Sequence, residues 1–280
     1  MSQPGKFKGK PWELVATIED YANKCRLPMI FRGSKIATSK QALQNMTPKP
    51  KVFVEFGTFV GTSAIAWAAM LRDFHGSDAK DLKVFTFEFD PNAADVARDL
   101  IAAAGVDDVV EVLTGPGAES LKKLHSEGRV KEGEVDVVFI DHWEECYLPD
   151  LKLCEELKLF RVGSLAIADN TDMPGAPDYL AYVKKGGEGS VKFESESLRS
   201  EETGHHRPVS TPAEDFLSFN NSEVLTCIAE HSGGEQGRGS LSCLDTSWDR
   251  GRGDPPPLLS LYTSVNICEA RPILVFLYGY

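Results

Sequence analysis

The chain has 280 residues, of which 42% are hydrophobic, so it suits one large domain with an extension and is short for two full domains. Thirty lysines and arginines face 42 aspartates and glutamates, a formal net charge of −12. Nucleic acids and anionic membranes need a basic surface, so we expect neither as a partner. No apolar run approaches the roughly 18 residues of a membrane span, and no signal peptide is apparent. The six cysteines form no CxxC pair, which predicts reduced thiols in a cytoplasmic protein.

Helical and strand-like segments alternate along the first two thirds of the chain. Two amphipathic stretches come first, at Pro11–Cys25 and Lys35–Asn45. Five short runs rich in valine, isoleucine and phenylalanine are predicted strands: Lys51–Phe56, Lys83–Glu88, Val109–Leu113, Val135–Asp141 and Ser164–Asp169. Apolar residues at three- and four-residue spacing between them predict four helices: Ser63–Phe74, Ala93–Ala104, Ala118–His125 and Leu148–Leu159. This alternation is typical of an α/β fold, a doubly wound and mostly parallel sheet with helices on both faces.

The composition changes after Lys192, since no lysine follows and glycine, serine and proline cluster. Such a composition favours loops or disorder. We therefore expect a domain over residues 1–202 and an irregular, partly disordered C-terminal extension over 203–280. Its apolar end, Pro272–Tyr280, is read either as a last strand or as an exposed end.

The first two predicted strands end in candidate ligand-binding residues. After Glu55 come Gly57 and Gly61, spaced as GxxxG, so the dinucleotide fingerprint GxGxxG is absent. This loop suits a smaller nucleoside ligand, and the alternative is a tight strand–helix turn without a ligand. Glu88 ends the second strand, where an acidic side chain can accept hydrogen bonds from ribose hydroxyls. Asp90 stands before a proline and is predicted mainly to cap the next helix.

The later strand ends add small and acidic residues. Gly117 and Ala118 follow the third strand and leave room for a planar base. Asp141 ends the fourth strand and Asp169-Asn170 the fifth, and these ends are expected to be neighbours. Two carboxylates and an amide oxygen are hard donors of the kind Mg²⁺ prefers. The alternative is that the two aspartates are separate loop caps.

At this point the sequence resembles the catechol O-methyltransferases. The resemblance runs from about Pro28 to Phe193, and its motifs occur in the family's order: VEFGTFVGTSA, FEFDPNAA, DHWEECYLPD and ADNTDMPGAPDYLAYV. It implies a Rossmann-like methyltransferase fold with a seven-stranded sheet. It also implies S-adenosylmethionine as methyl donor, Mg²⁺ as metal, and a small aromatic diol as acceptor. We expect a monomer.

The resemblance also implies roles for individual residues. The metal ligands correspond to Asp141, Asp169 and Asn170, and the ribose-binding acid to Glu88. The remaining donor-binding positions correspond to Phe31 (through its backbone), Glu55, Gly57, Ser63, Gly117, Ala118 and Trp143. The walls around the acceptor ring correspond to Trp143 and Pro174. Met29 and Lys35 correspond to an N-terminal segment that covers the donor.

Two departures from the family stand out. Where the family has a lysine that takes the hydroxyl proton, this chain has Glu144, which is read as a base of raised pKa, a metal contact or an exposed first-turn residue. The family's final antiparallel strand pair is half recognisable. Lys192–Ser200 looks like its first strand, with Glu201 or Glu202 near an acidic substrate-binding position. Its partner is expected to be missing or to be replaced by Ile273–Tyr278.

Three functions are compatible with the sequence. The first is a metal-dependent methyltransferase acting on a catechol-type diol. The second is a methyltransferase for another hydroxylated aromatic or secondary metabolite, since Glu144 and Leu27-Pro28 alter the acceptor rim. The third is a donor-binding homologue with impaired catalysis.

Overall fold

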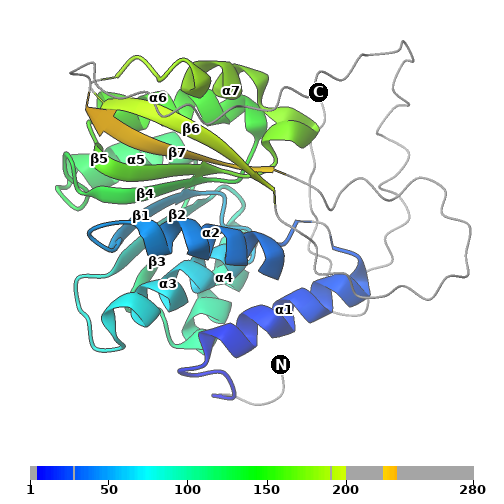
Figure 1. The fold of residues 1–280 in the computed structure, drawn as a ribbon. Helices are drawn as coiled ribbons and strands as arrows, with labels where there is room; N and C mark the ends of the chain where they lie inside the picture. Colours follow the sequence, from blue (N-terminus) through cyan, green and yellow to red (C-terminus); the bar gives the residue numbers. More distant parts are fainter. Residues whose placement is uncertain (1–4, 28, 190, 200–222, 232–280) are drawn as a thin grey trace, which may run out of the picture. The chain divides into compact units, whose positions relative to one another are not determined.

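The computed structural model describes residues 5–27, 29–189, 191–199 and 223–231 (Figure 1). They form a seven-stranded sheet in the order β3-β2-β1-β4-β5-β7-β6. The strands are β1 (Val52–Phe56), β2 (Lys83–Glu88), β3 (Val110–Thr114), β4 (Val135–Ile140), β5 (Phe160–Ala168), β6 (Val191–Arg199) and β7 (Glu223–His231). The helices are α1 (Pro11–Cys25), α2 (Gly33–Asn45), α3 (Thr62–His75), α4 (Pro91–Ala104), α5 (Gly117–Ser126), α6 (Tyr147–Glu156) and α7 (Pro177–Lys184), with the short turns η1 (Glu144–Cys146) and η2 (Thr171–Gly175).

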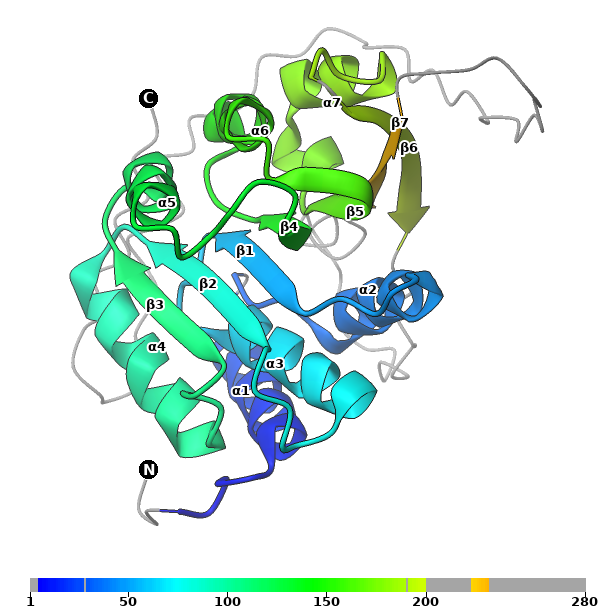
Figure 2. The ribbon, with the colours of Figure 1, turned by 90° about the vertical axis from the view of Figure 1, so that its left-hand side faces the viewer.

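The first five strands are parallel, and helices cover both faces of the sheet (Figures 1 and 2). Successive residues of a strand point to opposite faces, so both faces of a doubly covered strand must be apolar. In β1, Phe53 faces the layer of α1 to α4, whereas Val54 and Phe56 face the layer of α5 to α7. The predicted α/β class is therefore confirmed.

Most predicted elements occur within a few residues of their expected bounds. The helix predicted to end at Leu159 stops at Glu156, because Lys158 adopts a left-handed conformation (φ 53°) and turns the chain into β5. Strand β5 begins four residues before the prediction and carries an irregularity opposite Val135 and Val137. The π-helical turn η2 and the helix α7 had no counterpart among the predicted elements.

The first strand of the predicted final pair is confirmed as β6, Val191–Arg199, but the expectation for its partner was wrong. The partner of β6 is β7, which lies between β5 and β6 and is antiparallel to both. The chain thus returns to the sheet after residue 202, and the first compact unit extends to Ser232. The glycine- and serine-rich composition of the region hid the nine-residue run EVLTCIAEH, which has strand-forming residues. Ile273–Tyr278 lies outside the described residues.

No helix in the described part of the chain has the length and apolar character needed to cross a membrane.

Candidate active site

Asp141 and Asp169 lie side by side at the carboxyl edge of the sheet. Strands β4 and β5 are paired in parallel with Ile140 opposite Ala168, so the two aspartates are the next residues of adjacent strands. The Asp141 backbone N–H donates to Phe56 (2.8 Å), and that of Asp169 donates to Ile140 (3.0 Å). Neighbouring strands are about 4.8 Å apart, so the sheet itself brings these carboxylates together.

The site concentrates negative charge in a poorly solvated place. Burial raises the pKa of Asp141 well above its ordinary value, and the nearby Asp169 raises it further. Burial also raises the pKa of Asp169, while Lys35 opposes this shift. The Lys35 ammonium donates to Asp169 Oδ2 at 2.7 Å from helix α2.

These residues fit a divalent cation. In the described ranges, no three histidine, cysteine, aspartate or glutamate side chains converge as a metal-binding group. The candidate ligands for a cation are therefore the two carboxylates together with the Asn170 side chain. Asn170 has left-handed torsions (φ 53°, ψ 30°), a conformation that asparagine tolerates better than most residues. Adjacent oxygen donors whose charges repel one another are stabilised by a hard cation.

The loop after β1 passes close to this carboxylate pair. Gly57 has a φ of +98°, and a Cβ built on it would lie 2.0 Å from the Asp141 carbonyl oxygen. Only glycine allows the ends of β1 and β4 to approach this closely. Gly57 is therefore required for packing at the edge of the sheet, whether or not it also contacts a ligand.

Glu88 holds the same loop from β2. Its carboxylate accepts from the backbone N–H of Phe59 (2.6 Å) and of Asp90 (2.9 Å). Its partial burial raises its pKa. Asp90 accepts from the Asn92 backbone N–H at 2.8 Å and caps α4, which confirms the capping prediction.

Glu55 is placed differently from the expectation. It is completely buried and accepts hydrogen bonds from Trp67 Nε1 (2.9 Å) and Thr86 Oγ1 (2.5 Å), and Ser63 also bonds to it. In this arrangement Glu55 links β1 to β2 and α3 beneath the carboxyl edge of the sheet. Burial raises the pKa of Glu55 to about 7.

The other expected donor-binding residues are spread around the edge. Gly117 begins α5, where a Cβ would lie 2.6 Å from Phe56, so it too is required for packing, and the half-buried Ala118 follows it. Phe31 is buried against Trp67 and Phe139, which leaves only its backbone for a ligand.

The expected acceptor walls come from two segments that touch each other. Trp143 precedes η1 and is 56% exposed, and the exposed Pro174 lies in η2, which contacts η1. Glu144 is half-buried, which raises its pKa. Glu202 lies outside the described residues.

The sequence reasoning missed two supporting contacts. His142 hydrogen-bonds Asp150 (2.7 Å) and stacks on Tyr147, whose hydroxyl donates to the Asp169 carbonyl oxygen (3.0 Å). In the sequence, only the closeness of His142, Tyr147 and Asp150 within one motif pointed to the first of these contacts. Nothing in the sequence pointed to the ion pair between Lys35 and Asp169, because the two residues are distant in the chain.

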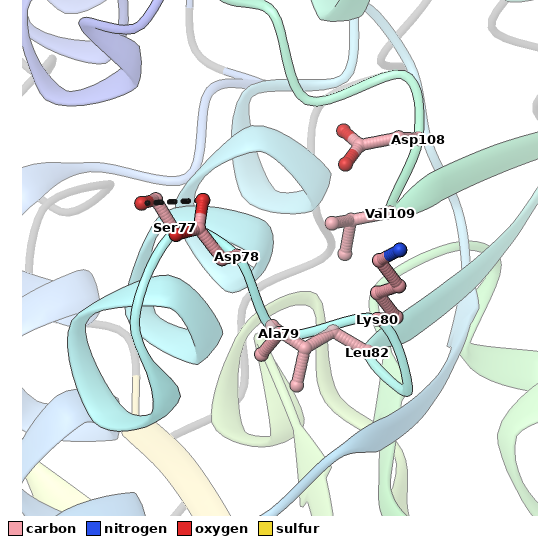
Figure 3. A pocket seen from close by; sticks show the side chains of 7 residues that line it. All are labelled: Ser77, Asp78, Ala79, Lys80, Leu82, Asp108 and Val109. Atoms are coloured by element: carbon pink, nitrogen blue, oxygen red, sulfur yellow. Dashed lines mark hydrogen bonds between the residues drawn. The ribbon is translucent and has the colours of Figure 1, made fainter.

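A cavity of about 530 Å³ lies elsewhere. It is lined by the α3–β2 loop and by Asp108 and Val109, at the amino ends of β2 and β3 (Figure 3). This position is opposite to the carboxyl edge, so the cavity is separate from the candidate site.

Comparisons with known proteins show the family and the fold. The family model described as O-methyltransferase matches residues 38–177. The catechol O-methyltransferase of Bos taurus is 32% identical over 69% of this chain and 65% of its own length. That of Sus scrofa is 36% identical over 52% of this chain and 72% of its own length. This chain thus spans just under two thirds of the bovine relative. An O-methyltransferase from Bacillus cereus, solved in complex with SAH, has 22% identity and a TM-score of 0.57 over 80% of this chain and 92% of that one, which establishes the fold.

Proposed function

Because this chain belongs to the O-methyltransferase family, with catechol O-methyltransferases among its relatives, we propose that it transfers the methyl group of S-adenosylmethionine to one hydroxyl of an aromatic diol bound with Mg²⁺. The observation that carries the proposal is the side-by-side placement of Asp141 and Asp169. The loop after β1 lies next to them, with Gly57 packed against Asp141 and the Phe59 backbone N–H bonded to Glu88. Two ligand sites, one for an acceptor and one for a donor, would then share one edge of the sheet.

The donor would lie across the ends of β1, β2 and β3. Glu88, at the tip of β2, would accept hydrogen bonds from ribose hydroxyls. Ala118 and the start of α5 follow β3, where the small side chain leaves room for a base. Family resemblance supports the identity of the donor, and the SAH named in the Bacillus cereus structure is the demethylated product of that donor.

The acceptor would lie over the ends of β4 and β5. Asp141, Asp169 and Asn170 would hold the cation, which when bound lowers the pKa of an acceptor hydroxyl and fixes the diol oxygens. Trp143 and Pro174 would confine the aromatic ring and exclude water. The protein then aligns the acceptor oxygen with the methyl carbon, and such alignment of two bound reactants is a large part of the rate gain.

A second acceptor class is favoured by one observation. Glu144 is half-buried and acts electrostatically on Asp141, the proposed metal ligand, so a carboxyl group stands where the family lysine would supply a positive charge. A carboxylate there disfavours an ionised phenol. Aromatic acceptors with a more acidic hydroxyl than catechol would tolerate this change, so they form the second candidate class.

The test is a methylation assay on the full chain. S-adenosylmethionine is supplied with catechol, caffeate or simple phenols, and methylated product is measured by mass spectrometry with and without EDTA. We expect product from the diols, its loss in EDTA and its return with excess Mg²⁺, because the cation ionises and orients the acceptor. Simple phenols should give much less product, because they lack the second oxygen for chelation.

Two variants sharpen the assay. Asp141→Asn should lower turnover by about a hundredfold or more, by loss of one metal ligand. Asp73→Asn is the control, since Asp73 pairs with Lys40 on the helical layer. Turnover that is indifferent to chelator and to Asp141→Asn would refute the metal-dependent mechanism. Binding of S-adenosylmethionine without any product would favour a donor-binding homologue.

A further inference from the structure

Lys35 brings a positive charge into the carboxylate pair from outside the sheet. It lies in the first turns of α2, and its ammonium is 2.7 Å from Asp169 Oδ2. The two side chains are only 13% and 3% exposed. Solvent therefore screens this ion pair much less than it screens an ion pair on the surface.

The charges around the pair give Lys35 a distinct position. Among the described groups with the largest effect on Asp141, the neighbours Asp169, Glu55 and Glu144 are acidic, and Lys35 is the basic one. Two adjacent carboxylates with acidic neighbours are unfavourable unless positive charge is close by. Lys35 supplies that charge from the chain itself.

A divalent cation on the same carboxylates would meet this ammonium. Both would contact Asp169, and two cations that share one carboxylate are within a few ångströms of each other. At that distance, in a poorly solvated site, their repulsion is large. Binding of the cation and the ion pair of Lys35 therefore oppose each other.

We propose that Lys35 is a tethered counter-ion that competes with the divalent cation for Asp169. It neutralises the site when no cation is bound, and it leaves Asp169 when a cation binds. The inference rests on the proposed metal dependence of the methyl transfer and adds a residue that sets the affinity for the metal.

The matched control comes from the same helix. Lys40 also lies in α2 and also pairs with an aspartate, Asp73, at 2.8 Å. That pair is more exposed and lies against α3, away from the carboxyl edge. Lys35→Met and Lys40→Met thus remove the same charge from the same helix, once inside the site and once outside it.

The experiment is a titration of the chelator-treated full chain with MgCl₂ by isothermal calorimetry, at about pH 8 so that protons compete little with the cation. We expect Lys35→Met to bind Mg²⁺ about tenfold or more tightly than the wild type, because the competing charge is gone. Lys35→Arg, which keeps the charge, should stay near the wild type, and Lys40→Met should be unchanged. Lys35→Gln is a second neutral variant with a polar end.

Thermal unfolding is the second readout and needs no turnover. In EDTA, Lys35→Met should unfold at a lower temperature than Lys40→Met, and saturating Mg²⁺ should raise its midpoint by more than that of the wild type. If both neutral variants at position 35 bind Mg²⁺ no more tightly than a wild type that does bind it, the counter-ion proposal is overturned and the methyltransferase proposal stands. If the wild type binds neither Mg²⁺ nor S-adenosylmethionine, the proposed function fails as well.

Discussion

Single residues at the ends of β1 and β4 decide how closely these strands approach each other. Gly57 has a positive φ of +98°, and a Cβ added there would lie 2.0 Å from a backbone carbonyl oxygen, an atom that cannot rotate away. This position therefore couples the stability of the fold to the geometry of the candidate site.

Gly57→Ala should destabilise the protein by more than about 2 kcal/mol and weaken the binding of S-adenosylmethionine, through strain and the clash with Asp141. Gly128→Ala is the control, because Gly128 also has a positive φ (+70°) but a Cβ added to it would meet nothing within 4 Å. Denaturant unfolding measures the first effect and calorimetry the second. Equal losses in the two variants would show that the clash is unimportant.

Glu144 is the residue at which this chain departs most clearly from the family pattern. Glu144→Lys should move the acidic limb of the pH–rate profile to lower pH by about one unit, because an ammonium favours the ionised acceptor and a carboxylate opposes it. The exposed neighbour Glu145 provides the control Glu145→Lys. Superimposable pH–rate profiles for the wild type and Glu144→Lys would show that Glu144 takes no part in the reaction.

Among the secondary-structure elements, strand β7 connects β6 to the rest of the sheet, because it lies between β5 and β6. It pairs with β5 over four residues, Leu165↔Ile228 to Ala168↔Leu225, and with β6 over nine. Without it, β5 would have an open edge and β6 would have no partner. Open edges of this kind favour aggregation.

A chain ending at residue 199 should therefore be markedly less soluble and less stable than a chain ending at residue 232, which keeps all seven strands of the sheet. Size-exclusion chromatography and thermal unfolding compare the two truncations. Similar behaviour of both would mean that the pairing of β7 contributes little to the fold.

At the scale of the whole molecule, buried carboxyl groups tie global stability to pH. Glu55 is fully buried, and its pKa in the folded protein is about 7 against an ordinary 4.5. Between these values the folded chain holds a proton that the unfolded chain has lost. The free energy of unfolding therefore falls as the pH rises from about 4.5 to about 7.

Glu55→Gln should remove this dependence and reduce the loss of stability between about pH 4.5 and pH 8 by about 3 kcal/mol. Urea unfolding followed by tryptophan fluorescence measures it, since Trp67 donates to Glu55. Glu119→Gln, on the exposed face of α5, serves as the control. If the stability of Glu55→Gln varies with pH as steeply as that of the wild type, the pH dependence of unfolding comes from Asp141 and Asp169 and not from Glu55.

The periodic part of the fold was open to prediction from the sequence. Doubly covered strands such as β4, VDVVFI, are apolar at every position except the buried Asp136, which pairs with Arg161. In the helices, apolar residues recur every three to four positions, because each element must bury the faces that pack on the core. Strand β7 was missed because its nine residues stand within a region of loop-like composition. The turn η2 was missed because no periodic pattern marks a π-helical turn.

For the candidate site, the chemical types and their order can be read from the amino-acid sequence: acidic or small residues at five successive strand ends, and a glycine where the chain must turn. That follows from local rules, since strand ends in a parallel sheet share one edge. Three-dimensional packing sets which of these groups are buried and which lie at the open edge of the sheet. Packing buries Glu55 between β2 and α3, makes Gly57 necessary for the close approach of β1 and β4, and pairs Lys35 with Asp169. The sequence does not reveal these contacts, because burial and ion pairing depend on segments far apart in the chain.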